Sequence, residues 1–357
     1  MDPLALNEKR IAVDAMGGDL APEAVVKGVV LALSEAEGFH CLLVGDRARV
    51  TVLLARHPHP RSRVEIVHAE EVIGMDEPPK EAVLRKPRAS VLVAAGMLGR
   101  DEADALVSAG NTGAVVLASA RHLPVVPGTS RAGLAALIPA RRREAGDLGF
   151  VLLIDVGATV HVTSQQLAHF ATLGTAYLRA ALGVASPRVA LLNIGEEATK
   201  GDAMLREAYQ ILSRMKDIRF VGNVEGKDIP SGGADVVVCE GFTGNVILKM
   251  VEGVAAAAFD LTREVSKRRL LWRFGVGLLG PALRALARKT DFAEYGGAPI
   301  LGFSRLVIKA HGRSDARAIR SAVLVAHRAL ENDLLGRITG GIARVNETLF
   351  ASPSGTG

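Results

Sequence analysis

The residues best suited to chemistry lie at positions 307–312, where the apolar run of VIKAHG ends in a cation, an imidazole and a glycine. The apolar part is typical of a buried strand, and ligands of α/β sheets bind beyond the carboxyl ends of strands. Lys309 supplies a charge for an anion, His311 can move a proton near neutral pH, and Gly312 lets a ligand approach the main chain. The segment therefore predicts an anion site; the alternative is an ordinary strand-to-helix turn with a surface lysine.

Five other apolar runs end in loops that combine glycine with Asp, Asn, Ser or Thr. They follow residues 13, 107, 154, 192 and 238. The candidate binding residues in these loops are Gly17, Gly18, Ser108, Asn111, Thr112, Gly113, Lys200, Thr243, Gly244 and Asn245. In a parallel sheet such loops gather at one edge, where free amides and helix N-termini form an anion site. One such loop alone is more often simple helix capping, but five together indicate a binding site.

Two glycine-rich segments imitate nucleotide-binding motifs. Residues 275–280 match the dinucleotide fingerprint, but they follow a basic segment rather than a strand. Residues 222–227 are one residue short of a P-loop and lack its Ser or Thr. The sequence also has no zinc-protease histidine pair, no Gly-x-Ser-x-Gly elbow and no paired cysteines. We therefore predict neither a cofactor nor a metal.

Short apolar runs that alternate with longer amphipathic stretches predict an α/β fold: a multilayer structure around a mostly parallel sheet. The predicted strands are residues 11–15, 41–44, 64–67, 105–107, 150–154, 189–193, 218–221, 236–239 and 306–308. The predicted helices are residues 22–34, 89–98, 113–121, 164–182, 201–212, 245–269 and 315–330. We expect a single large domain over residues 1–350, or two intimately joined lobes, and a disordered tail over 351–357.

Composition narrows the class of protein. Hydrophobic residues make up 49% of the 357 and aromatic residues only 4%, and there are 38 glycines. Cys41 and Cys239 both lie in apolar runs and are interpreted as reduced thiols, which favours the cytoplasm. No signal segment or membrane-spanning run is evident. The net charge of +5 favours an acidic partner or surface, whereas no motif supports nucleic-acid binding.

Residues 263–289 form a basic and apolar helical segment that we expect to protrude from the α/β domain. Eight Lys and Arg stand there against the single acid Glu264, with leucines, Phe274 and the only tryptophan, Trp272, between them. Such a segment suits a helix lying on anionic lipid, and the tryptophan favours that interpretation. The alternative is a core-packing helical hairpin with a solvated basic face.

The loops together closely resemble those of bacterial phosphate acyltransferases of the PlsX type. The resemblance spans residues 11–330 and is carried by AVDAMGGD at 12–19, SAGNTGA at 108–114, NIGEE at 193–197, GNVEG at 222–226, GFTGNV at 241–246, YGGAP at 295–299 and IKAHG at 308–312. Thr159 stands where the family usually shows Asn, and Glu240 where Asp is usual. Either departure can alter a hydrogen bond in the site.

The resemblance implies transfer of an acyl group from acyl-acyl carrier protein to inorganic phosphate, at the entry to phospholipid synthesis. It also implies a fold related to phosphotransacetylases and isopropylmalate-type dehydrogenases. The implied partners are acyl carrier protein, inorganic phosphate, a second copy of the chain, the anionic inner face of the cell membrane and a downstream glycerol-3-phosphate acyltransferase. The basic run of Arg141, Arg142 and Arg143 is a candidate dock for the acidic carrier, or a solvated loop.

This reaction needs bound phosphate, an adjacent thioester carbonyl and donors for the developing oxyanion. We expect Lys309 and the amides near Thr243, Gly244 and Asn245 to hold phosphate, and His311 to orient or deprotonate it. Ser108, Asn111 and Thr112 are the expected carbonyl donors, and Asp14 and Asp19 are expected to order the loops. The competing hypotheses are a nicotinamide-dependent dehydrogenase and a non-catalytic membrane scaffold.

Overall fold

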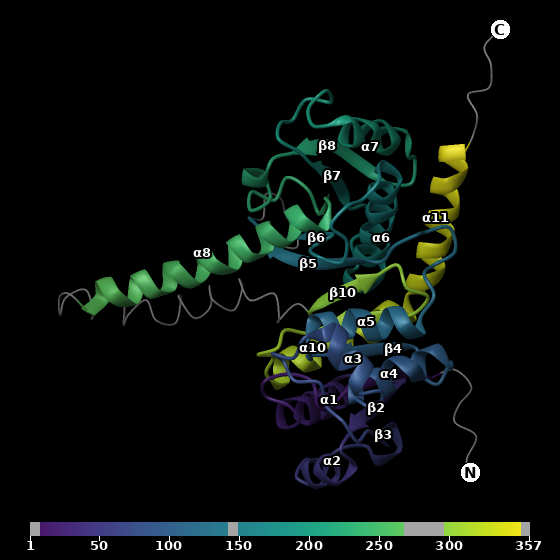
Figure 1. The fold of residues 1–357 in the computed structure, drawn as a ribbon, viewed down its shortest axis with the longest axis vertical. Helices are drawn as coiled ribbons and strands as arrows, with labels where there is room; N and C mark the ends of the chain where they lie inside the picture. Colours follow the sequence, from purple (N-terminus) through teal and green to yellow (C-terminus); the bar gives the residue numbers. More distant parts are fainter. Residues whose placement is uncertain (1–7, 142–148, 268–295, 351–357) are drawn as a thin grey trace.

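The computed structural model describes residues 8–141, 149–267 and 296–350 (Figure 1). All strands of these segments belong to one 11-stranded sheet in the order β3-β2-β1-β4-β11-β10-β5-β6-β9-β7-β8. The strands are β1 Lys9–Asp14, β2 Phe39–Gly45, β3 Val64–His68, β4 Ala105–Ser108, β5 Gly133–Pro139, β6 Phe150–Ile154, β7 Arg188–Leu192, β8 Arg219–Val224, β9 Val236–Val238, β10 Ala298–Leu301 and β11 Leu306–Lys309. The predicted α/β class is confirmed, and each of the nine predicted strands is present.

The helices cover both faces of this sheet. They are α1 Glu23–Glu35, α2 Arg47–Leu54, α3 Pro79–Arg85, α4 Ser90–Gly99, α5 Thr112–His122, α6 Ser164–Leu182, α7 Ala203–Arg214, α8 Gly241–Lys267, α10 Ala316–Glu331 and α11 Leu334–Phe350. Successive strand residues enter different cores: Ile11 and Val13 pack with residues of α1, α6 and α10, whereas Ala12 packs with residues of α4 and α5. This alternation follows from the two-residue period of a strand.

The sequence analysis missed two strands and three helices. Strand β5 contains Ala135 and Ala136, which have low strand propensity, and β10 is only four residues long. Helices α2, α3 and α11 were also absent from the prediction. In α11, three glycines at positions 336, 340 and 341 argue against a helix, yet its buried Ile338 and Ile342 pack into the core. Here tertiary packing overrides propensity.

The sheet reverses direction in its middle. Strand β5 is antiparallel to both of its neighbours, β10 and β6, and β10 is antiparallel to β11. The remaining pairs are parallel. Consequently β1, β4 and β11 run one way, and β6, β9 and β7 run the other way. The sequence analysis expected every glycine-rich loop at one edge of the sheet, because it assumed one common strand direction. This expectation is wrong: the loops after β1, β4 and β11 and those after β6, β9 and β7 follow strands of opposite direction.

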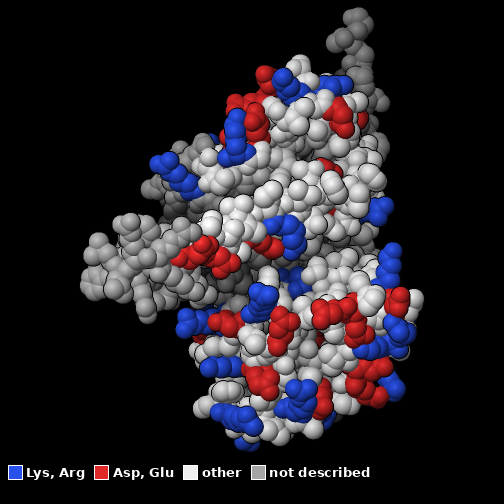
Figure 2. Space-filling model, turned by 60° about the vertical axis from the view of Figure 1, so that its left-hand side comes forward, with Lys and Arg blue, Asp and Glu red and all other residues white. Residues whose placement is uncertain are grey.

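Helix α8 extends away from the rest of the chain (Figure 1). Phe242, Met250, Val254 and Leu261 are largely exposed, whereas Ile247 packs against the core beside the sheet. By length and composition, its residues 241–262 could cross a membrane, with a mean hydropathy of 1.3. On the surface of the protein that faces the viewer in Figure 2, few charged side chains lie across the middle. The regions above and below it are densely charged. Most of the predicted membrane segment, and the predicted tail, lie outside the described residues.

Candidate active site

Three glycine-rich loops meet at the carboxyl ends of the neighbouring strands β1, β4 and β11. The amide of Asp19 donates to the carbonyl of Gly312 over 2.8 Å. A Cβ placed on Gly17 would lie 2.7 Å from the amide nitrogen of Gly110, and one on Gly18 would lie 3.1 Å from the Gly312 carbonyl oxygen. Gly18 also has φ +112°, which side chains rarely adopt. These positions require glycine because three backbones converge there.

Beneath these loops, the carboxylate of Asp14 is buried, with the residue only 2% exposed. Its two oxygens accept hydrogen bonds from the hydroxyls of Ser90 at 2.6 Å and Ser108 at 2.7 Å. The amide of Met16 donates at 3.3 Å. Burial raises the pKa of Asp14, and the bonds from Ser108 and Ser90 oppose that rise. Ser90, on α4, belongs to none of the glycine-rich loops, and the sequence analysis missed it.

Lys309 lies in the same buried region, 6% exposed. Its ammonium donates to the carbonyls of Ala310 and, at 3.4 Å, of Ala109. Burial lowers the pKa of Lys309 to about 8, while the charges of Asp14 and Asp19 act to raise it. At neutral pH the side chain is therefore mostly charged. A charged ammonium with neutral carbonyl partners is well suited to bind an anion.

The N-terminus of α5 adds main-chain donors to this site. The Asn111 side chain caps the helix, since its Oδ1 accepts from the amide of Ala114 at 3.2 Å. Among the described residues, the amides of Asn111, Thr112 and Gly113 have no acceptor. Unbonded amides at a helix N-terminus attract negative charge.

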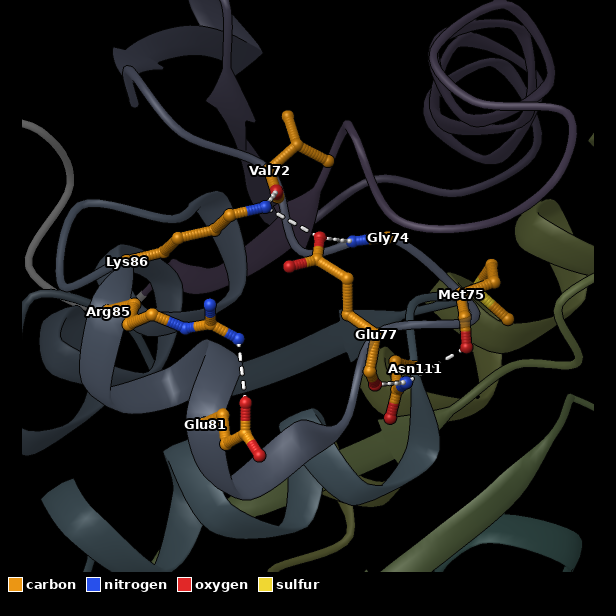
Figure 3. Close-up of polar contacts among 8 residues, drawn as sticks. All are labelled: Val72, Gly74, Met75, Glu77, Glu81, Arg85, Lys86 and Asn111. Atoms are coloured by element: carbon orange, nitrogen blue, oxygen red, sulfur yellow. Dashed lines mark hydrogen bonds and ion pairs between the residues drawn. The ribbon is translucent and has the colours of Figure 1, made fainter.

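Asn111 also fixes the chain around residues 72–79 (Figure 3). Its Nδ2 donates to the carbonyls of Met75 at 2.9 Å and Glu77 at 3.0 Å. The Glu77 side chain in turn accepts from the amide of Gly74 at 2.7 Å and from Lys86 at 2.5 Å. The Asn111 side chain is thus fully used inside the protein, as is the Ser108 hydroxyl. Of the three expected carbonyl-oxygen donors, only Thr112 keeps a hydroxyl that has no hydrogen bond within the described part of the chain.

His311 is exposed beside these loops. Its Nδ1 accepts a hydrogen bond from the amide of Arg313 at 3.1 Å. Because an acceptor nitrogen carries no proton, the neutral ring has its proton on Nε2. In that tautomer the Nε2–H is the donor of the neutral ring.

A second group of loops follows β6 and β9. Asp155 is buried and accepts from the amide of Thr159 at 2.7 Å and from its hydroxyl at 2.6 Å. The Glu240 carboxylate caps α8, accepting from the amide of Thr243 at 3.1 Å and from the Thr243 hydroxyl. The Gly244 amide donates to the Glu240 carbonyl at 3.0 Å. The N-terminus of α8 thus holds an internal carboxylate where the sequence analysis expected phosphate.

The remaining predicted residues, Asn245 and Lys200, also lie in or beside this second group of loops. A Cβ on Gly157 would lie 3.7 Å from the side chain of Asn245. The Lys200 side chain is exposed, and its carbonyl accepts from Asn193 Nδ2 at 3.1 Å. The structure thus gathers Lys309, His311 and the loops after β1 and β4. Lys200 follows β7, and Thr243, Gly244 and Asn245 follow β9; both strands run in the opposite direction.

An open groove of about 850 Å³ lies beside the second group. Its lining is mostly apolar, with Thr243 and Asn193 among its polar groups. The apolar side chains are Val160, Val162, Leu192, Ile194, Met204, Leu205, Phe242 and Ile247. Ile194, Phe242 and Val160 are largely exposed, which is unusual unless a ligand or partner covers them.

Known proteins share this sequence over nearly its whole length. Residues 9–337 match the family described as "Fatty acid synthesis protein". A "Phosphate acyltransferase" of Myxococcus xanthus is 45% identical, with 97% of each chain covered. Another from Heliobacterium modesticaldum is 43% identical over 92% of this chain and 96% of its own. The chain belongs to the phosphate acyltransferase family. It is an acyltransferase of fatty acid and phospholipid synthesis, as the motifs predicted.

Solved structures confirm the fold expected for this phosphate acyltransferase. A phosphotransacetylase from Streptococcus pyogenes has a TM-score of 0.58 and 18% identity, covering 91% of this chain and 94% of its own. A branched-chain phosphotransacylase from Enterococcus faecalis V583 has a TM-score of 0.53 and 16% identity, covering 90% and 99%. At these identities the likeness concerns the fold alone.

Proposed function

We propose that this phosphate acyltransferase moves a long-chain acyl group from acyl-acyl carrier protein to inorganic phosphate, releasing acyl-phosphate. The observation that carries this proposal is the buried Lys309 ammonium near the unbonded amides at the N-terminus of α5. Phosphate itself is the nucleophile, so no covalent intermediate on a side chain is needed. A phosphate oxygen attacks the carbonyl carbon, the new C–O bond replaces the C–S bond, and the thiolate leaves and takes up a proton.

Each group has a separate task in this mechanism. Lys309 holds the phosphate in a buried region, partly out of contact with water. An electrostatic contact is stronger there than in bulk water. His311 orients it by donating from Nε2. The amides of Thr112 and Gly113 stabilise the carbonyl oxygen as it becomes negative. The glycines at positions 17, 18 and 312 let the reactants approach the main chain.

We assign the long acyl chain to the apolar groove beside the second group of loops. These loops follow strands opposite in direction to those that carry Lys309, so in this proposal the acyl chain runs between the two groups. The groove's volume of about 850 Å³ falls within the usual range of ligand sites, about 300–1,000 Å³. Each buried methylene contributes about 0.8 kcal/mol to binding, so a long chain gains most from such a surface. A short, polar substrate would leave this surface exposed.

The proposed partners follow from charge and exposed apolar surface. An acidic carrier protein suits a chain of net charge +5, and Arg141 is exposed; Arg142 and Arg143 lie outside the described residues. A second copy of the chain would cover the apolar side of α8. The anionic inner face of the cell membrane would receive the product, which a glycerol-3-phosphate acyltransferase would then use. We also propose that residues 1–350 form a single large domain.

The test combines a long-chain acyl thioester with phosphate and traps acyl-phosphate with hydroxylamine. We expect trapped product only when phosphate is present, without added nicotinamide, flavin or metal. Carrier-protein and coenzyme A thioesters of one chain length should be compared, with the carrier protein giving the higher kcat/KM. Thiol release at the same rate without phosphate would contradict the proposal and indicate a thioesterase.

A further inference from the structure

Three adjacent strands place Asp14, Ser108 and Lys309 in one row. On β1 and β4, Val13 pairs with Val107, so the next residues, Asp14 and Ser108, are neighbours. On β4 and β11, Ser108 pairs directly with Lys309. Residues that pair across strands share a face of the sheet, so the three side chains point the same way.

That face is the one covered by α4. The residues two positions earlier on these strands, Ala12, Leu106 and Val307, all pack into the core that contains α4. Ser90, at the first turn of α4, reaches down and donates to Asp14 Oδ1, while Ser108 donates to Oδ2. A Cβ on Gly17 would lie 2.4 Å from Oδ2. The carboxylate is therefore held from three sides in a space that admits no larger neighbour.

We propose that Asp14 is a positioning residue for the reaction: its carboxylate, held by Ser90 and Ser108, keeps the buried Lys309 ammonium charged for phosphate. This inference rests on the proposed role of Lys309 as a phosphate ligand. It assigns Asp14 an electrostatic task beyond ordering its own loop. It also explains why a serine from α4 takes part in the site.

The negative charge of Asp14 favours the charged form of Lys309. A lone ammonium loses its charge readily when it is buried, because water no longer solvates it. Among the described residues, the charged groups that act on Lys309 are Asp14 and Asp19, and both raise its pKa. His311, two residues further along the chain, is the neighbouring titratable side chain. With the pKa at about 8, phosphate binding should weaken as pH rises through that value. Removing the Asp14 charge should move this loss to lower pH.

The experiment measures kcat and the KM for phosphate from about pH 6 to pH 10. It compares the wild type with Asp14→Asn and Ser90→Ala. Asp14→Asn should raise the KM for phosphate, and its alkaline loss should begin about one pH unit lower, because the lost charge acts on Lys309 across one intervening strand. Ser90→Ala should shift the loss in the same direction by less. Because phosphate titrates identically in every sample, the difference reports on the enzyme.

A matched control is Ser119→Ala. Ser119 is equally buried on α5, but its hydroxyl donates to the Val115 carbonyl within the helix. It should leave the alkaline loss unchanged. A folded Asp14→Asn enzyme with the wild-type pH dependence overturns the inference. If that variant does not fold, Ser90→Ala decides, and an unshifted profile overturns it. Wild-type turnover that needs no phosphate would instead refute the proposed function.

Discussion

At the scale of single residues, Lys309 and His311 contribute different kinds of chemistry. The Lys309 ammonium is buried, and among the described residues it donates only to main-chain carbonyls, so no carboxylate there contacts it directly. His311 is exposed, and its Nδ1 is already engaged by the amide of Arg313. The first residue therefore suits binding of phosphate, and the second suits orientation through Nε2.

Substitution separates these two tasks. Lys309→Ala should raise the KM for phosphate, and His311→Ala should lower kcat, by about a hundredfold or more, typical of lost electrostatic or acid–base groups. Both enzymes should keep the wild-type melting temperature to within a few degrees. Lys249→Ala, which removes an exposed lysine of α8 that pairs with Glu252, is the control. Wild-type kinetics in both site variants would move the site to Asn245 and Lys200.

At the scale of elements, Asn111 joins the start of α5 to the chain around residues 72–79. One side chain both caps the helix and binds two carbonyls of that segment. The amides that we assign to the carbonyl oxygen belong to the same turn. The position of these donors thus depends on a cap and on a tertiary contact together.

Two substitutions at Asn111 distinguish the cap from the contact. Asn111→Ala should lower the free energy of unfolding by about 1 kcal/mol for the cap alone, and by more once the two contacts are counted. Asn111→Ser keeps a capping oxygen and should recover part of this loss. In both variants the amides of residues 72–77 should exchange hydrogen faster than in the wild type. Unchanged exchange in Asn111→Ser would show that Nδ2 does not hold the segment.

At the scale of the whole molecule, the extended α8 includes residues 263–267, the beginning of the basic and apolar segment 263–289 (Figure 1). A long-chain acyl-phosphate is poorly soluble, so its release at a bilayer is physically favourable. Lys and Arg near an anionic surface contribute about 1 kcal/mol each. We therefore expect the eight basic residues of this segment to attach the protein reversibly to an anionic membrane.

Replacing both Leu271 and Trp272 by Asp should abolish co-sedimentation with anionic liposomes. Activity on a soluble thioester and the melting temperature should stay unchanged, because we assign these side chains to the lipid interface. Leu84→Asp, at a largely exposed leucine of α3, should leave sedimentation unaffected. A large loss of stability with unchanged lipid binding would assign Leu271 and Trp272 to the core.

The order of strands and helices was largely predictable from the sequence, because burial on a strand or helix leaves a local periodic pattern. The nine predicted strands are all present, and the glycine-rich loops follow the strands expected of them. The missed elements carry weak local signals, such as the alanines of β5 and the glycines of α11. Their conformation comes from contacts with distant residues, which no short window of sequence contains.

The sequence by itself determined which residue types stand at the strand ends, and from these the family and its reaction. Only the tertiary structure decided which of them are neighbours. Strand direction reverses at β5, so Lys309 is grouped with Asp14 and Ser108, whereas Asn245 belongs with Asp155 and Glu240. The role of Ser90 likewise depends on which face α4 covers. Strand order and register arise from packing of the whole sheet, and a local pattern records only whether a residue is buried.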